Sequence, residues 1–319
     1  MSFQFPIAQC DVADKKALVE YRTKRSQWLD WLKHDDAHAI WRAIAALSNN
    51  DVKFRVLAHL AQTDERSALR NPMVSQAVVS DYVSNQILGV RRLIDTRNDV
   101  ISLRRLVREL KANANLLTRE NYVAHDGMPY KYSVANLVPL VPPNVAQWVP
   151  TTGSQAYISS QLAHEYFDQL CGIPSTQRRR DDVISTKTLQ FLDDCLGGCD
   201  ADQLVKWSHK FLAHAADADS RRQFILVKSH PKVSQITATV QQFIRTAQAI
   251  SAYILNDSTH GSIVPVAQFD RFEYLVSDDK VRVSLDRYWR DTAREYDDCL
   301  HLALEGLAAN TVVQSADAR

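Results

Sequence analysis

Apolar side chains recur every three to four positions through most of the chain, which is the spacing that an amphipathic α-helix requires. Long helices are predicted over residues 12–33, 73–96, 100–111, 154–171, 185–196, 232–255 and 283–307. Asp35 or Asp36 can cap a shorter helix over residues 37–47. A separate helix is expected to begin after Asn50 or Asp51, which would cap it.

The composition of the chain agrees with a helical fold. Its 319 residues include eight Gly and ten Pro, about 6% together, against roughly 12% in average usage. This shortage of turn residues favours helices over a turn-rich β fold, and only residues 262–282 leave a choice between a short helix and a hairpin. The predicted fold class is therefore all-α, a multi-helix bundle in a single helical domain over residues 1–319.

Helical periodicity fails between residues 125 and 153, which hold five of the ten prolines. Loops of this length are uncommon in compact domains unless they are functional or an insertion. The segment also carries a group of apolar residues, Leu137, Val138, Leu140 and Val141. We therefore predict one long Pro-rich loop that packs onto the surface and covers a groove or a partner site.

The charge balance and the cysteines narrow the class of protein. Lys and Arg number 38 against 37 Asp and Glu, so any nucleic-acid site must be local rather than a property of the whole surface. Five cysteines in a chain of this length indicate reduced thiols. The sequence shows neither an 18-residue apolar run nor a signal-peptide pattern, so we expect a cytoplasmic protein with no membrane contact and no cofactor.

Candidate chemistry gathers in residues 206–221, where a helical apolar stripe runs beside titratable side chains. Lys206, Lys210 and His214 follow one another at i, i+4 and i+8 and share one edge of the helix. Such an edge favours an anion, and an imidazole both takes and gives a proton near neutral pH. His209 is expected on the solvated side. Arg221 is a more distant candidate cation, about 11 Å along the axis from His214.

The apolar stripe of the same helix predicts how it packs. Trp207 and Phe211 are expected to be buried against the helix over residues 73–96. The face that this helix offers carries Val83, Val90 and Ile94.

Helix 73–96 ends in a charged turn, Arg91-Arg-Leu-Ile-Asp95. We expect it to form an antiparallel pair with helix 100–111, for which Asn98 or Asp99 would be the cap. One interpretation of Arg91, Arg92 and Asp95 is a surface ion-pair cluster. The other is a nucleic-acid-binding role, in which Arg91 or Arg92 lies beside His214 and supplies a cation there.

Two pairs of potential metal ligands are interpreted as structural. His34 and His38 share a helical face but have no third ligand nearby, so the segment is taken as a capping region with solvated histidines. Cys195 and Cys199 enclose Leu-Gly-Gly, which is not a zinc-ligand spacing and is typical of a turn between helices. No metal site is predicted.

Two segments together carry a family resemblance: Arg91-Arg-Leu-Ile-Asp95 followed by Val100-Ile-Ser-Leu-Arg-Arg-Leu-Val107, and His209-Lys-Phe-Leu-Ala-His-Ala-Ala-Asp217. They resemble the HEPN-type helical proteins of bacterial abortive-infection systems. The resemblance implies a HEPN-like bundle core over residues 73–124 and 154–258, with N-terminal helices over 1–70, the Pro-rich insertion over 125–153 and a C-terminal extension over 259–319.

In that family a bundle helix carries an Arg, a polar neighbour and, four to six residues after the Arg, a His, which serve metal-independent RNA cleavage at a dimer interface. By resemblance His214 would be the catalytic His and His209 the polar neighbour, with Lys210 close by. Ser208 stands where the family has its Arg. A lysine, either Lys206 or Lys210, or an Arg from another helix would then have to supply the charge that Ser lacks.

The resemblance implies two alternative functions. One is a metal-independent endoribonuclease of a defence or toxin-antitoxin system, in which His214 acts on a ribose 2′-hydroxyl and nearby cations hold the phosphate. The other is a non-catalytic HEPN-like module that binds nucleotide, RNA or a partner protein. The partners implied are RNA or nucleotide, a cognate antitoxin or defence-system protein, and a second copy of the chain in a homodimer.

Overall fold

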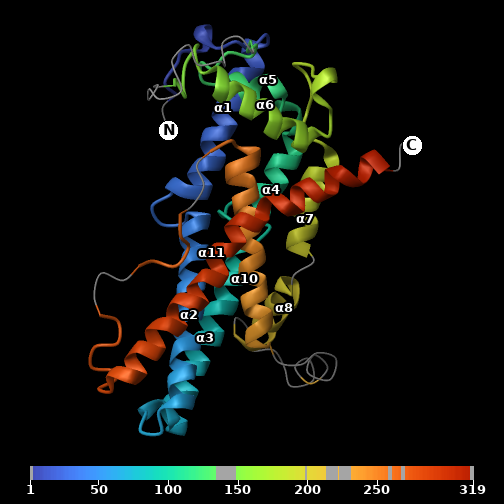
Figure 1. The fold of residues 1–319 in the computed structure, drawn as a ribbon. Helices are drawn as coiled ribbons and strands as arrows, with labels where there is room; N and C mark the ends of the chain where they lie inside the picture. The colour runs from blue at the N-terminus through green and yellow to red at the C-terminus, as the bar shows by residue number, and fades with distance from the viewer. Residues whose placement is uncertain are drawn as a thin grey trace, which may run out of the picture.

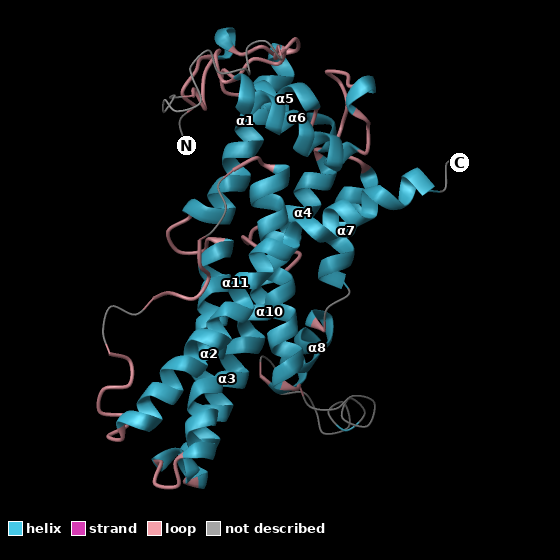
Figure 2. Ribbon diagram, viewed as in Figure 1, coloured by secondary structure: helices cyan, strands magenta, loops and turns pink. Residues whose placement is uncertain are grey.

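The computed structural model describes residues 3–133, 149–197, 200–212, 222, 231–257, 261–266 and 270–316. Helices make up nearly all of the regular structure, and no β-strand forms in these ranges (Figures 1 and 2). The one exception is an isolated bridge between Thr118 and Val183. The predicted all-α, multi-helix fold is therefore confirmed. Most of the predicted Pro-rich loop, residues 134–148, lies outside the described residues.

The first N-terminal helix lies close to its predicted bounds, whereas the second is longer and more continuous than predicted. Helix α1 spans Lys15–Leu29 and passes directly into a π-helical turn over Asp30–His34. Helix α2 then runs without interruption over Ile40–Thr63. The expectation of two helices separated by a cap at Asn50 or Asp51 is wrong, because Asp51 lies inside α2 and its carboxylate is bonded to other helices.

Helices α3, Pro72–Leu93, and α4, Leu103–Ala112, begin at capping residues. Asn71 caps α3, and Ser102 caps α4 in place of the predicted Asn98 or Asp99. The predicted antiparallel pairing of these two helices is wrong. Helix α4 lies further along the long axis of the molecule and packs against α7, Thr186–Gly197, whereas α3 packs against α2 (Figure 1).

Helix α5 spans Arg119–Ala124 and packs on α6, Tyr157–Cys171. The helical spacing of Ile158, Leu162 and Tyr166 predicts that they form the buried stripe of α6. This prediction is wrong, since all three are more than a third exposed. The buried face consists instead of Ser160, Ala163, His164, Phe167 and Leu170. Small and polar residues on this face let α5 approach closely, and Arg119 of α5 donates a hydrogen bond to the His164 carbonyl of α6. Hydrophobic periodicity cannot predict a face of this kind, because its buried residues are not all apolar.

Helix α8 covers Ala201–Phe211 and packs along α3, as predicted. Helix α10 covers Val233–Gln248 and continues as a π-helical turn over Ala249–Ile254. Helix α11 covers Asp279–Ala316. In the described parts of the preceding segment, 261–266 and 270–278, the chain forms turns rather than the short helix or hairpin that the sequence allowed. Short 3-10 turns occur at Ile7–Gln9, Ala68–Arg70, Ala114–Leu116 and Ser175–Gln177.

A continuous hydrophobic core runs through the molecule from Cys10 to Leu300. Its centre is the contact between α2, α3, α10 and α11, which lie side by side along the long axis (Figure 1). Periodicity predicted the buried faces of α4 and α10 correctly. The apolar positions at helical spacing from Leu103 to Leu110 and from Ile236 to Ile254 are all buried, whereas Val233, which the same spacing places on the core face of α10, is 37% exposed.

A buried carboxylate joins the four central helices. Asp51 on α2 is fully buried and accepts hydrogen bonds from the Tyr82 hydroxyl of α3 at 2.5 Å and the Tyr296 hydroxyl of α11 at 2.6 Å. The Thr237 hydroxyl of α10 lies 3.2 Å from the same carboxylate. Burial, followed by the charge of Asp51, raises the pKa of both tyrosines well above the ordinary value. Each central helix is thus tied to the others by a bond to one side chain.

Candidate functional site

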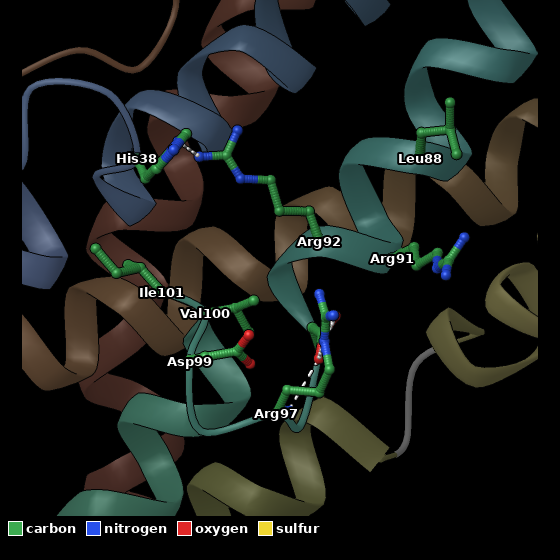
Figure 3. Close-up of a pocket in the computed structure, with 9 residues that line it drawn as sticks. His38, Leu88, Arg91, Arg92, Arg97, Asp99, Val100 and Ile101 are labelled. Atoms are coloured by element: carbon green, nitrogen blue, oxygen red, sulfur yellow. Dashed lines mark hydrogen bonds and ion pairs between the residues drawn. The ribbon is translucent and has the colours of Figure 1, made fainter.

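An open cavity lies where α3 ends and the chain turns toward α4. Its volume is about 510 Å³, within the range in which small ligands and parts of larger ones bind. The lining residues are His38, Leu88, Arg91, Arg92, Asp95, Arg97, Asp99, Val100 and Ile101 (Figure 3). We call this space the arginine cavity. The two arginines singled out from the sequence, Arg91 and Arg92, both line it.

Local sequence explains why the arginines lie at this end of α3. Arg91 and Arg92 occupy its last turn, where the exposed carbonyls of a helix favour cations. Gly89 lets the same turn lie tightly on α2, since a Cβ at that position would be 2.5 Å from the Leu47 Cδ2 atom. The arginine-bearing turn is therefore held against a rigid neighbour.

Each arginine of the cavity has a different environment. Arg92 Nη2 lies 2.6 Å from His38 Nδ1. Arg97 pairs with Asp95 at 3.3 Å. Within the described chain, Arg91 makes no hydrogen bond or ion pair. Figure 3 shows Arg92 extending toward His38 and Arg91 extending the other way from the helix end.

Asp95 keeps its charge in this setting. Partial burial opposes its ionisation, but hydrogen bonds from the Arg97 backbone and side chain, together with the charges of Arg97 and Arg91, hold the pKa of Asp95 below the ordinary value. The cavity thus combines three arginines with two carboxylates, Asp95 and Asp99. Guanidinium groups bind phosphate, and a carboxylate accepts hydrogen bonds from a sugar hydroxyl.

The cations of α8 lie away from this cavity. Asp202 in the first turn of α8 is bonded to Arg104 at the start of α4, 3.2 Å away, and α8 runs antiparallel to α3 (Figure 1). Lys206 and Lys210 follow Asp202 by four and eight residues, or about 6 and 12 Å along the axis. The described part of the chain therefore places Arg91 and Arg92 at one end of α8 and Lys210 and His209 at the other.

Ser208, which stands where HEPN-type proteins would have their Arg if the resemblance holds, faces inward. Ser208 is fully buried, and its hydroxyl has no hydrogen-bond partner among the described residues. A longer, charged side chain at this position would point into the protein rather than toward a ligand. His214 and Arg221, the other two predicted site residues of this stretch, lie outside the described residues.

The apolar stripe of α8 is less buried than predicted. Trp207 and Phe211 are both half-buried, and their rings stack with centroids 5.0 Å apart. Leu204 and Ser208 are the α8 residues that face the interior most directly. The packing of α8 on α3 is confirmed. The prediction that Trp207 and Phe211 are buried is wrong, because Leu204 and Ser208 occupy the buried face of the helix instead.

A second cluster of charged groups, which the sequence analysis missed, surrounds Arg119 on α5. Arg119 is fully buried and is paired with Asp182 at 2.8 Å and Asp168 at 2.7 Å. Arg178 binds Asp168 from the other side at 2.5 Å. These residues come from distant positions, so only the tertiary structure shows that they meet.

Arg119 and His125 are six residues apart, and the polar Glu120 directly follows the Arg, which is the spacing that the motif of HEPN-type proteins would have. The spacing itself was the signal that could have identified them. Both are enclosed: His125 is 7% exposed, and burial together with the charge of Arg25 lowers its pKa to about 3. Phe3 contacts the His125 ring edge to face, with centroids 6.2 Å apart.

No group of three potential metal ligands comes together in the described ranges. The helices seen there also lack the combination of length and apolar character that crossing a bilayer requires. No family model matches the chain, and the comparisons with curated proteins and with solved structures give no match. The functional interpretation therefore rests on the geometry of the site.

Proposed function

We propose that this protein is an RNA-binding helical protein of the HEPN-like type and that the arginine cavity holds the RNA backbone. The observation that carries the proposal is the gathering of Arg91, Arg92 and Arg97 in one open cavity, with Arg91 unpaired among the described residues. An arginine that gains little from its neighbours is available to a phosphate.

The directions of the side chains support an extended ligand. Arg91 and Arg92 extend to opposite sides of the end of α3 (Figure 3), so they suit successive phosphates of a strand better than a single phosphate. The two carboxylates of the cavity, Asp95 and Asp99, are acceptors for ribose 2′-hydroxyls, which distinguish RNA from DNA. Leu88, Val100 and Ile101 add an apolar wall against which a base can pack.

Binding of a fluorescent single-stranded RNA, measured by anisotropy at several salt concentrations, tests the proposal. Arg91→Ala/Arg92→Ala should weaken binding at least tenfold, and the slope of log affinity against log salt should fall by about 0.7 for each phosphate that no longer pairs with an arginine. Arg290→Ala/Arg294→Ala is the matched control, since both are exposed arginines on α11 and the same number of charges is removed. Equal affinities for the double variant and this control would refute the assignment.

RNA cleavage is a second candidate function, favoured by the spacing of Arg119 and His125. Burial, followed by the charge of Arg25, lowers the pKa of His125 to about 3, so its imidazole is neutral at pH 7 but a poor proton acceptor while it stays enclosed. Cleavage at this pair requires RNA to reach two residues that are now covered, and phosphate to replace the carboxylates that bind Arg119. RNA incubated with chelator should be cut by the wild type and left intact by His125→Asn. Cleavage by both would place the chemistry elsewhere.

A further inference from the structure

A second cavity, remote from the arginine cavity along the sequence, lies between α2, the beginning of α11 and the segment that precedes α11. Its volume is about 520 Å³. The lining residues are Asn49, Lys53, Val56, Leu57, Pro265, Val266, Arg271, Phe272, Leu275 and Trp289. None of these residues lines the arginine cavity, so a ligand bound here would be independent of the proposed RNA binding.

The walls of this second cavity are mainly apolar. Its inner side is formed by side chains that belong to the hydrophobic core, including Val56, Phe272 and Trp289. Its outer side is formed by Val266, which is 73% exposed, and Leu275, which is 43% exposed. Large apolar side chains exposed beside a hollow are typical of a site whose ligand shields them from water.

One cationic group is built into the apolar wall. The guanidinium carbon of Arg271 lies 4.3 Å from the centre of the Trp289 ring, over its face. The Arg271 Nη1 atom is buried, and no hydrogen-bond partner for it exists within the described chain. A buried guanidinium nitrogen without an acceptor is unfavourable. It is therefore a specific point at which an acceptor from a ligand would be stabilised.

The other polar groups of the cavity indicate the charge of that ligand. Lys53 on α2 is exposed and adds a second positive charge, and Asn49, one turn earlier, adds an amide. Of the residues that the structure describes, none with a carboxylate lines the cavity. An anionic group near Arg271 would therefore meet cations without a competing anion, while the rest of the ligand would contact apolar walls.

We propose that this cavity binds an amphipathic carboxylate, a small molecule with a single carboxylate head and a hydrocarbon body. The planar guanidinium of Arg271 matches a carboxylate in a two-bond arrangement. The hydrocarbon body packs against Val56, Phe272 and Leu275. The site cannot be predicted from the sequence, because residues 262–282 show no regular period and meet α2 only in the folded chain.

Isothermal titration of the full-length protein with decanoate tests the proposal, with decanol as a ligand of the same chain length but without the charge. Decanoate should bind saturably and at least tenfold more tightly than decanol. Arg271→Gln should reduce decanoate binding to the level of decanol, whereas Arg271→Lys should restore part of it. The thermal midpoint of each variant confirms that it is folded.

Two further variants separate this site from the rest of the molecule. Leu275→Trp places a larger ring at the exposed edge of the cavity and should weaken both ligands. Arg91→Ala/Arg92→Ala should leave decanoate binding unchanged, because those residues belong to the arginine cavity. The proposal is wrong if decanoate does not bind saturably, if decanol binds equally well, or if folded Arg271→Gln binds decanoate like the wild type.

Discussion

Removing the tyrosine hydroxyls that bind Asp51 should weaken the central bundle substantially. The Asp51 carboxylate is fully buried in α2 and receives bonds of 2.5 Å from Tyr82 and 2.6 Å from Tyr296. Tyr82→Phe and Tyr296→Phe each delete one bond without changing the shape of the ring. Each variant leaves the carboxylate buried with fewer donors, so the cost includes the poorer stabilisation of the charge as well as the missing hydrogen bond.

The structure sets the expected size of this effect. A hydrogen bond to a charged group contributes about 1.5–3 kcal/mol, so each single variant should lower the free energy of unfolding by that amount. In the double variant only Thr237 and the more distant Arg55, 3.9 Å away, would still contact the carboxylate among the described residues. The double variant should therefore be destabilised by more than the sum of the single variants, with a coupling of roughly 0.5–3 kcal/mol.

Urea unfolding followed by circular dichroism measures these free energies. Tyr274→Phe is the matched control, because Tyr274 is 96% exposed, and it should change stability by less than about 0.5 kcal/mol. Single variants that unfold like this control would show that Asp51 is not held by the two hydroxyls. Strictly additive losses of stability would show that the two bonds do not depend on each other.

The buried titratable groups lead to three other predictions. Burial and the charge of Asp51 raise the pKa of Tyr82 and Tyr296 in the folded state. Their contribution to the free energy of unfolding should therefore be fully present below about pH 10 and fall above it, as tyrosine ionises in the unfolded chain. Urea titrations should show a smaller alkaline loss of stability for the double Phe variant. Burial lowers the pKa of His125 to about 3 and that of His164 to about 4. Between about pH 6.5 and pH 5 these two histidines therefore take up protons only in the unfolded chain. The free energy of unfolding should fall over this range by roughly 1.4 kcal/mol per pH unit for each histidine. Substituting His164 by Gln should flatten that slope, and an unchanged slope would contradict the assignment. Arg119→Ala should cost about 3–5 kcal/mol by leaving the buried Asp182 without its ion-pair partner, while Asp168 keeps Arg178, and a loss below about 1 kcal/mol in chemical denaturation would contradict it.

The sequence could predict the class of fold and many of the buried positions, because both depend on local spacing. Leu103, Leu106, Val107 and Leu110 repeat at helical intervals, and all four are fully buried. A side chain's position around a helix follows from its number in the sequence alone. This reasoning fails where packing selects small or polar residues, as on α6, where the apolar stripe is exposed and His164 is buried.

The candidate sites, too, were predictable where they depend on neighbouring residues and not where they depend on packing. Sequence reasoning identified Arg91 and Arg92, since they adjoin at a recognisable helix end, but did not connect them with His38, which is 54 residues from Arg92. It took Asp51 for a helix cap because Asp favours that position. Three hydroxyls from other helices instead hold the Asp51 carboxylate inside the bundle.

Helical periodicity and the shortage of Gly and Pro thus determined an all-α chain with a large apolar core, since these are properties of neighbouring residues. Only the tertiary structure decided which charged groups meet. The partners of Asp51 on α3 and α11 are 31 and 245 residues away from it, and the cavity at Arg271 joins α2 to the start of α11. Local spacing contains no information about such contacts, because their geometry depends on how the helices pack against one another.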